Sequence, residues 1–199
     1  MARTPSEMIP LGSPLPAFEL PDTDGALVSS SDFKEARALL VCFICNHCPF
    51  VVHLRAALAA FAREYQGRGV AVIAISSNDV ERYPQDGPEA MRAERLDAGY
   101  SFPYLYDESQ AVAHAFQARC TPDFFLYGAR AGGVRSLLYR GEFDESRPGN
   151  GRPVTGAALR AACNAVLADT PVPAPQRPSL GCNIKWRPGQ SPEERVSAF

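Results

Sequence analysis

The sequence predicts an α/β fold, and three observations lead to this prediction. Two continuous apolar runs of strand length, residues 38–44 and 70–75, are separated by a helix-like stretch over residues 49–65. Such runs are typical of strands buried in a parallel sheet, and strand, helix and strand in this order form a βαβ unit. A second group of two strands and a helix follows from residue 123. Together the two groups predict one central sheet flanked by helices.

A short N-terminal hairpin is expected before this sheet. Apolar residues at 18–20 and 27–28 flank the turn-forming sequence Pro-Asp-Thr-Asp-Gly at 21–25, which is a hairpin signal. The helix over residues 49–65 has apolar residues at helical spacing, and Gly67 marks its end.

The middle of the chain breaks this pattern. Pro84 and Gly87 predict a loop over residues 81–87, and helices are expected over residues 88–98 and 109–117. We therefore expect an insertion between the two halves of the sheet.

The second half completes the sheet. Strands are expected over residues 123–127 and 134–139, with turn residues 128–133 between them, and a helix is expected over residues 156–168. The order of elements is then βαβ, insertion, ββα.

The sequence predicts a domain over residues 1–170 and a C-terminal tail over residues 171–199. The tail is rich in proline, which favours an extended backbone. Leu180, Ile184 and Trp186 supply apolar anchors around Cys182, so we expect the tail to pack on the same domain.

Composition argues against several classes of partner. The 199 residues carry a formal net charge of −2, with a pI near 5.9, so neither a nucleic acid nor an anionic membrane surface is indicated. No apolar run approaches the ~20 residues that a membrane span needs, and the first residues lack the apolar core of a secretory signal. We expect a cytoplasmic protein, in which most of the six cysteines stay reduced and serve catalysis or metal binding.

The sequence Cys45-Asn46-His47-Cys48 lies where the first buried strand passes into the helix. Two cysteines three positions apart at a helix start lie within about 5–6 Å, close enough for a disulfide. The helix N-terminus favours a thiolate there, and His47 is expected to add to that effect by charge and hydrogen bonding. We expect Asn46 to cap the helix, Cys45 to be the more exposed and attacking thiol, and Cys48 to resolve the mixed disulfide.

Four phrases in this order resemble the thioredoxin fold and, more closely, its peroxiredoxin-like redoxin branch, which is related to AhpC/TSA proteins. They are Phe-Ile-Cys-Asn-His-Cys-Pro-Phe at 43–50, Cys-Thr-Pro-Asp-Phe at 120–124, Tyr-Arg-Gly at 139–141 with residues 144–150, and Ser-Leu-Gly-Cys-Asn-Ile-Lys-Trp at 179–186. The resemblance implies a mixed sheet and a cis peptide bond between Thr121 and Pro122. It also implies that this bend faces the cysteine pair and keeps the next strand's edge open for a substrate backbone.

The same resemblance implies two enzyme activities. The first is a thiol-disulfide oxidoreductase that uses Cys45 and Cys48 and acts on a disulfide-containing protein or small molecule. The second is a thiol peroxidase, since Cys48-Pro49 matches the peroxidatic register, although Cys45 replaces the usual Thr. Peroxiredoxins also place an Arg against that cysteine, a role that Arg119 or Arg140 would have to fill. Either enzyme needs a dithiol reductant system, and neither needs a cofactor or a metal.

A third interpretation is a non-catalytic module that senses oxidation or binds a partner. Two further thiols are candidates for redox roles. Cys120 lies two residues before Pro122, where a structural and a redox role are equally expected. Cys182 either relays electrons to the pair from a docked tail or is simply buried under Trp186.

The remaining candidates have plainer interpretations. Cys42 and Cys163 lie in apolar patterns and are expected in the core. Cys42, Cys45 and Cys48 are spaced like part of an iron–sulfur run, but the fourth cysteine is absent, so no metal site is predicted. His53 and His114 are expected on helix surfaces or as hydrogen-bonded core residues. Arg140, Asp144 and Arg147 are expected to form a structural ion-pair turn.

Overall fold

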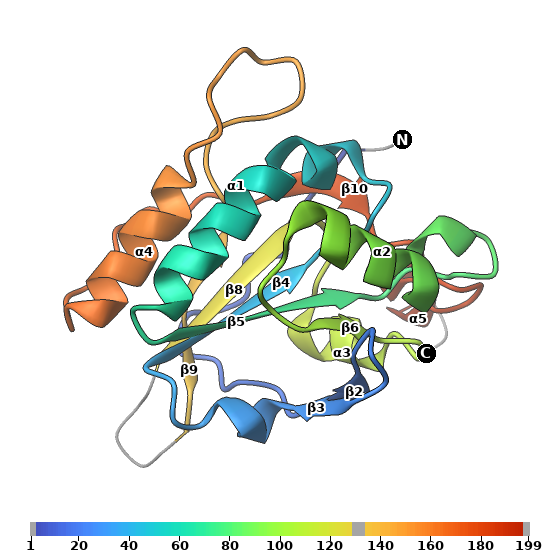
Figure 1. Cartoon of the computed structure of the whole chain (residues 1–199), viewed down its shortest axis with the longest axis horizontal. Coiled ribbons are helices and arrows are strands. Elements are labelled where there is room, and N and C mark those ends of the chain that lie inside the picture. Colours follow the sequence, from blue (N-terminus) through green and yellow to red (C-terminus); the bar gives the residue numbers. More distant parts are fainter. Residues whose placement is uncertain (1–2, 129–133, 197–199) are drawn as a thin grey trace.

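The structure is a computed structural model that describes residues 3–128 and 134–196. A five-stranded sheet with the strand order β6-β5-β4-β8-β9 forms its centre (Figure 1). The strands are β4 (Ala38–Phe43), β5 (Val70–Ser76), β6 (Tyr104–Tyr106), β8 (Asp123–Gly128) and β9 (Ser136–Gly141). β5 is parallel to β4 and β6, whereas β8 is antiparallel to β4 and β9. The predicted mixed sheet is therefore confirmed.

The central strand β4 divides the core into two clusters. All six of its residues are buried, and successive side chains point to opposite faces of the sheet. Leu40 and Cys42 face the helices α1 (Pro49–Gln66), α2 (Pro88–Ala98) and α4 (Ala157–Leu167). Leu39, Val41 and Phe43 face α3 (Ala111–Phe116) and the hairpin of β2 (Glu19–Pro21) and β3 (Leu27–Ser29). This burial on both faces explains why β4 reads as a continuous apolar run.

Helix α1 holds the cysteine pair against the sheet. Its N-cap is Cys48, Pro49 occupies the first turn, where a missing N–H costs nothing, and Gly67 is its C-cap. Its inner face buries residues at helical spacing, each contributing about 1.5–3 kcal/mol: Val51, Leu54, Leu58, Phe61 and Tyr65. The expectation that Asn46 caps the helix is wrong, because the Asn46 side chain donates to the Gln85 carbonyl and accepts from the Tyr104 hydroxyl.

The segment expected as an insertion is partly built into the sheet. Residues 88–98 form α2 as predicted, and α3 occupies the middle of the second predicted helix. Between them, β6 pairs in parallel with β5 and becomes the edge of the central sheet. The loop over residues 81–87 contains one 3-10 turn, Pro84–Asp86. The short run of β6 gave no distinct period in the sequence, because all three of its residues are buried.

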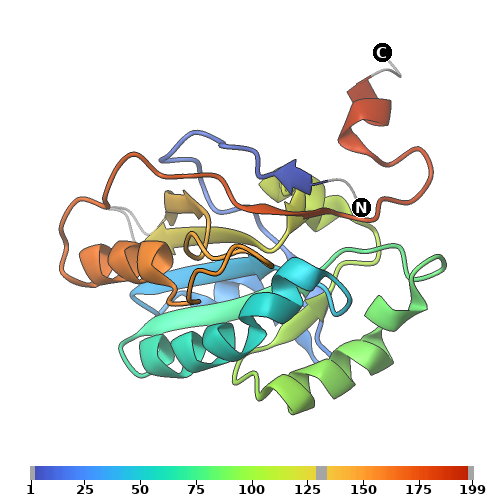
Figure 2. The same cartoon turned by 90° about the horizontal axis from the view of Figure 1, so that it is seen from above.

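The tail and the N-terminus form a second, small sheet. Its order is β1 (Arg3–Pro5), β10 (Leu180–Asn183) and β7 (Cys120–Thr121), all antiparallel. Figure 2 shows the blue N-terminal strand beside the red tail. A short helix, α5 (Pro192–Val196), follows. Through β10 the tail pairs with both β1 and β7, whereas the division into a domain over residues 1–170 and a tail packed on it stays a prediction.

The other predicted elements are confirmed with small shifts at their ends. The hairpin pairs Leu20 with Val28, and the last helix is α4. A short 3-10 turn, Ser30–Phe33, follows the hairpin. Part of the predicted turn at 128–133 lies outside the described residues. Within the described part of the chain, no helix combines the length and the apolarity needed to cross a membrane.

Candidate active site

Cys45 and Cys48 lie just beyond the carboxyl end of β4, where the chain turns into α1. Their exposed fractions are 2% and 0%, and both thiols are free. The two side chains are within hydrogen-bond reach of each other. The structure therefore places the pair close together, as the spacing predicts. The expected greater exposure of Cys45 gives that thiol no better access to a substrate, because both side chains are buried.

The bend at Thr121 and Pro122 faces this pair. The peptide bond between them is cis, as the sequence resemblance implies. The Thr121 hydroxyl lies 3.4 Å from Sγ of Cys45, and the Cys48 thiol donates to the Thr121 carbonyl oxygen at 3.1 Å. One residue thus contacts both sulfurs. The hydroxyl is able to donate to a Cys45 thiolate, whereas the carbonyl accepts only from a protonated Cys48.

Electrostatics assign the thiolate to Cys48. The hydrogen bond from Cys45 is the main cause that lowers the pKa of Cys48 from 9.0 to about 5, and Cys182 and the Val51 amide donate as well. The same bond to Cys48, followed by burial and the charge of Asp86, raises the pKa of Cys45 well above its usual value. The N-terminus of the 18-residue helix α1 also favours an anion at Cys48. On ionisation Sγ of Cys48 must turn away from the Thr121 carbonyl toward these donors. This argues against the predicted attack by Cys45.

A titration of the reduced protein tests this assignment. We expect the ultraviolet absorbance of a thiolate to appear with a midpoint near pH 5 and to be missing in Cys48→Ser. Because folding lowers this pKa from 9.0, the thiolate's contribution to stability is full above pH 9 and is lost as the pH falls through about 5. Cys163→Ser is the control, because burial raises the pKa of that thiol to about 12. A first midpoint near 9 in the wild type would contradict the assignment.

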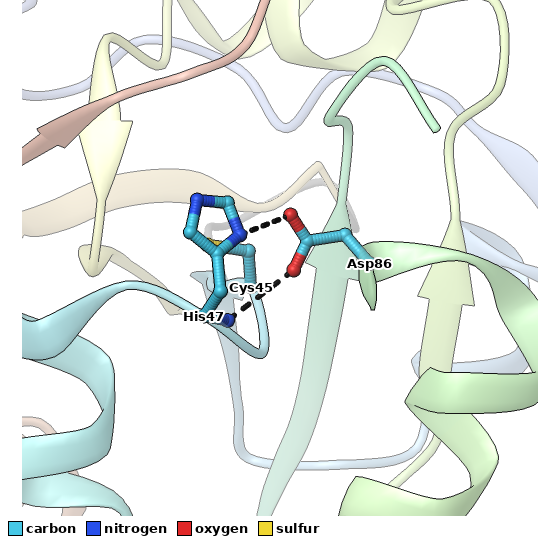
Figure 3. A group of neighbouring side chains, drawn as sticks. All are labelled: Cys45, His47 and Asp86. Atoms are coloured by element: carbon cyan, nitrogen blue, oxygen red, sulfur yellow. Dashed lines mark hydrogen bonds and ion pairs between the residues drawn. The ribbon is translucent and has the colours of Figure 1, made fainter. Parts of the chain in front are cut away.

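Asp86 organises the loop between the two cysteines. Its buried carboxylate accepts from the amides of Asn46 and His47 at 2.9 and 3.3 Å, and from the side chains of His47 and Asn78 at 2.6 and 2.8 Å. Figure 3 shows Asp86 reaching from the segment before α2 to the His47 ring and amide. The ring also stacks on Tyr83, with centroids 5.5 Å apart. His47 therefore bonds to a carboxylate through Nδ1, and the negative charge beside it offsets the thiolate stabilisation that the sequence predicts.

The same three residues have the donor types of a metal site. One atom from each of Cys45, His47 and Asp86 lies within 4.8 Å of the others. However, both Asp86 oxygens already accept two hydrogen bonds each, and Nδ1 of His47 is bonded to one of them. The hydrogen bonds of the loop explain why these three residues lie together, and we interpret Asp86 as the residue that holds the loop of the thiol pair in place.

The variant Asp86→Asn tests that support. An amide group keeps the shape of the carboxylate, but its N–H group faces hydrogen-bond donors, so we expect the free energy of unfolding to fall by about 1–2 kcal/mol. We also expect the pKa of Cys45 to fall, because the negative charge that raises it is removed. Urea unfolding and the thiol titration measure the two effects. Asp79→Asn is the matched control, because Asp79 is 2% exposed, but its carboxylate accepts from the Glu81 amide and pairs with Arg82. Equal effects of both variants would contradict a specific role for Asp86.

The strands on both sides of Pro122 are already paired. β10 pairs with β7, the strand before Pro122, in the register Cys182–Thr121. The strand after Pro122, β8, is paired on both edges, with β4 and β9, so the expectation that its edge stays open is wrong. Gly181 permits the approach of β10, because a Cβ built on it would lie 2.0 Å from the Thr121 carbonyl oxygen. Cys182 lies within hydrogen-bond reach of Cys48. The third thiol is thus at the pair, as the docked-tail alternative requires.

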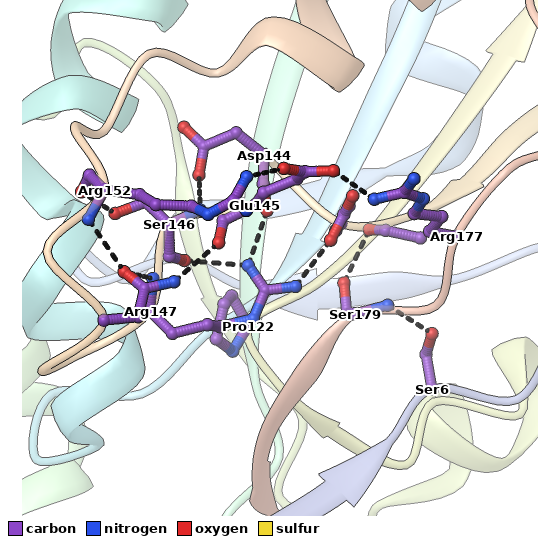
Figure 4. Close-up of polar contacts among 12 residues, drawn as sticks. Ser6, Pro122, Asp144, Glu145, Ser146, Arg147, Arg152, Arg177 and Ser179 are labelled. Carbon is purple, nitrogen blue, oxygen red and sulfur yellow. Dashed lines mark hydrogen bonds and ion pairs between the residues drawn. The ribbon is translucent and has the colours of Figure 1, made fainter.

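The loop after β9 closes the other side of Pro122 (Figure 4). Arg147 donates to the Glu142 carboxylate at 2.6 Å and to the backbone carbonyls of Asp144 and Ser146. The hollow beside Pro122 has only about 10 Å³, and its lining includes Phe50, Leu54, Glu142, Arg147 and Ser179. In this state the hollow beside Pro122 has room for about one water molecule.

Arg140, Asp144 and Arg147 do not pair with one another through their charged groups, so the predicted ion-pair turn is wrong. The Asp144 carboxylate accepts from the amides of Ser146, Thr155 and Gly156, and so it orders the loop before α4 instead of pairing with an arginine. Arg140 donates to Ile9 and Gln176. The charges alone suggested that Asp144 pairs with an arginine, but nearby backbone amides donate to its carboxylate instead.

The other cysteines have fewer signs of reactivity. Burial is the main cause that raises the pKa values of Cys42, Cys120 and Cys163. Cys42 and Cys163 lie in the core as predicted. Cys120 is buried next to the pair, with its thiol directed at the Pro122 carbonyl at 3.6 Å. Its candidate redox role stays a prediction.

The two remaining histidines lie away from the thiol pair. Nε2 of His53 bonds to Ser146 at 2.7 Å, and His114 stacks on Trp186 with ring centroids 4.4 Å apart. Trp186 thus packs on α3 and belongs to a different core cluster from Cys182.

Sequence reasoning missed Asp86 and Asn78. Asp86 lies in the segment interpreted as a loop, Asn78 lies between that loop and the preceding strand, and neither falls in a recognisable motif. The sequence offered only a weak indication of their role. The segment that holds them is rich in carboxylate and amide side chains and begins at the edge of the sheet where parallel strands end.

Comparison with known families gives one match. The AhpC/TSA family matches residues 11–137. Among curated proteins, nothing matches this chain.

Three solved structures are similar to the chain. A hypothetical protein from Sinorhizobium meliloti 1021 is 53% identical, covers 94% of this chain and 100% of its own, and has a TM-score of 0.90. An uncharacterized conserved protein from Geobacillus kaustophilus is 48% identical, with 94% and 98% covered and a TM-score of 0.90. A candidate thioredoxin from Neisseria meningitidis is 26% identical, with 77% and 89% covered and a TM-score of 0.58. The fold is thioredoxin-like.

Proposed function

The chain belongs to the AhpC/TSA family, and we propose that it is a thiol-disulfide oxidoreductase that cycles Cys45 and Cys48 between dithiol and disulfide. The observation that carries this proposal is the contact of both sulfurs with Thr121 at the cis-proline bend, combined with the low pKa of Cys48. A low pKa supplies the thiolate that attacks, and the contacts hold the second thiol beside it.

Each turn of the proposed cycle reduces one substrate disulfide and oxidises the Cys45–Cys48 dithiol. The Cys48 thiolate attacks one sulfur of the substrate, and the other sulfur leaves as a thiolate that takes up a proton. The Cys45 thiol loses its proton, attacks Sγ of Cys48 and releases the second half of the substrate. The enzyme has lost two electrons to the substrate, and a dithiol reductant system restores the thiols.

We propose a low-molecular-weight disulfide as the substrate class. Both sulfurs are buried, β10 covers the edge next to Pro122, and the hollow there is about 10 Å³. A folded protein substrate needs an open strand edge to add its backbone, whereas a small disulfide needs only a local movement of the loop around Arg147.

A thiol peroxidase is the second candidate, because the pKa of Cys48 and its place before Pro49 fit a peroxidatic thiol. In that reaction the Cys48 thiolate takes one peroxide oxygen and becomes a sulfenic acid, an alcohol or water leaves, and Cys45 condenses with it to release water. The two arginines expected to assist are engaged elsewhere: Arg119 with Glu7 and Glu193, and Arg140 with Ile9 and Gln176. We therefore rank this candidate second.

Parallel assays on the reduced protein distinguish these activities. The substrates are oxidised glutathione, insulin and hydrogen peroxide, and the readouts are consumption of each and the disulfide formed, identified by peptide mass spectrometry. We expect fastest turnover with the small disulfide and a Cys45–Cys48 bond in the product. Faster consumption of peroxide would favour the peroxidase. Formation of the bond without turnover of any substrate would favour a redox-sensing module.

A further inference from the structure

Two thiols form hydrogen bonds with Cys48, and the proposed cycle uses one of them. Cys45 and Cys182 are both within hydrogen-bond reach of its sulfur, and Cys182 comes from the C-terminal tail. All three side chains lie in the same buried cluster. A thiol in a packed core is commonly only a space-filling side chain, so the question is whether the structure fixes Cys182 toward Cys48.

The register of β10 fixes the position of Cys182. Cys182 pairs with Thr121, the residue that contacts both other sulfurs. The opposite edge of β10 pairs with β1, in which Arg3 is the partner of Cys182. β10 is thus the middle strand of a three-stranded sheet, and a shift of one residue would turn Cys182 to the other face.

Both ends of β10 are also anchored. On one side, Ser179 exchanges hydrogen bonds with Ser6 and donates from its hydroxyl to the Gly141 carbonyl (Figure 4). On the other side, the Lys185 amide donates to Asn78, whose side chain donates in turn to Asp86. The tail and the loop of the cysteine pair therefore share one hydrogen-bond network. Fixed neighbours of this kind raise the effective concentration of a thiol at its target.

From this placement we propose that Cys182 is a third redox thiol, which attacks Sγ of Cys48 and forms a Cys48–Cys182 disulfide. The inference rests on the proposed function, because it needs Cys48 to be oxidised first. When Cys48 carries half of a substrate, Cys182 loses its proton, the new bond forms, and the substrate thiolate leaves and takes up a proton. When Cys48 is bonded to Cys45, the same attack releases Cys45 as a thiol, and no electrons leave the protein.

The charges around Cys182 make it active only after Cys48 is oxidised. Burial, followed by the hydrogen bond to Cys48 and the charge of that thiolate, raises the pKa of Cys182 to about 12, whereas Lys185 favours its ionised form. Oxidation of Cys48 removes both the hydrogen bond and the like charge. Lys185 and the Cys120 thiol still lie near Cys182, and Lys185 favours the ionised form, so ionisation of Cys182 becomes easier at the stage that needs it.

The test removes Cys45 and asks whether Cys182 resolves the mixed disulfide. We compare Cys45→Ser with the double variant Cys45→Ser/Cys182→Ser, each treated with one equivalent of oxidised glutathione. In the single variant we expect a Cys48–Cys182 bond and little glutathione on the protein. In the double variant we expect glutathione to remain on Cys48, with release slowed at least about tenfold. Cys45→Ser/Cys163→Ser is the matched control, and it should behave like the single variant.

The outcomes separate this inference from the proposed function. If Cys45→Ser and the double variant retain glutathione on Cys48 equally, the inference is wrong while attack by Cys48 stands. If neither variant nor the wild type reacts at Cys48, the proposed function itself fails. Mapping of mildly oxidised wild type gives a readout that needs no substitution: a Cys48–Cys182 bond beside the Cys45–Cys48 bond supports the exchange, and complete absence of the former contradicts it.

Discussion

Replacing Cys48 with serine is expected to abolish disulfide turnover, with a loss on the order of 10³-fold or more. Cys48 is the thiol whose pKa is lowered to about 5, and both other thiols of the site direct their hydrogen bonds to it. A serine hydroxyl in that place is not ionised at neutral pH and forms no mixed disulfide. The measurement is steady-state turnover of oxidised glutathione with a reductant in excess.

Two comparisons make the Cys48 experiment specific. Cys163→Ser should retain normal turnover, because Cys163 is a buried residue of α4 outside the site. Cys45→Ser should retain part of the activity, since Cys182 is available to resolve the mixed disulfide. If instead Cys48→Ser forms a stable mixed disulfide and Cys45→Ser does not react, the attacking thiol is Cys45, and the electrostatic assignment is wrong.

The second large effect is expected for Gly181→Ala. A Cβ at this position would lie 2.0 Å from the Thr121 carbonyl oxygen and 3.1 Å from the Pro122 nitrogen, both of which are backbone atoms. The clash has to be relieved by moving β10 away from β7, so we expect a loss of about 3 kcal/mol in the free energy of unfolding. The same movement takes Cys182 away from Cys48. Urea unfolding and the yield of Cys48–Cys182 bond measure the two consequences.

Gly67→Ala is the matched control for this variant. Neither glycine has a positive φ, and the nearest atom to a Cβ at Gly67 is 3.5 Å away, an ordinary contact. We expect its stability to stay within about 0.5 kcal/mol of the wild type. A similarly small effect of Gly181→Ala would mean that β10 does not press on the cis-proline bend, and the inference about Cys182 would lose its geometric basis.

The local elements of this fold could be predicted because their signals are short-range. The run that becomes β4 is apolar on both faces, and α1 shows helical spacing between a proline and a glycine. The spacing of Cys45 and Cys48 alone predicted that the thiols are neighbours. The strand β6 was missed for the same reason, because three buried residues carry no period.

The roles within the site could not be predicted in the same way. The sequence favoured Cys45 as the attacking thiol and His47 as its support. The structure gives the low pKa to Cys48 and binds the His47 ring to Asp86, thirty-nine positions away. A pKa depends on every charge and donor within a few ångströms, and two of the donors that lower the pKa of Cys48, on Thr121 and Cys182, come from distant parts of the chain.

The sequence by itself determined the fold class, through the order of its elements, and the thiol pair, through the spacing of two cysteines, and its resemblance to the redoxin branch implied the proline bend. Only the tertiary structure decided that β10 covers the bend, that Thr121 contacts both thiols of the pair, and that Cys182 lies beside Cys48. These contacts join positions more than sixty residues apart. Their geometry is set by strand register and by the space that Gly181 leaves open, and neither is expressed in the order of neighbouring residues.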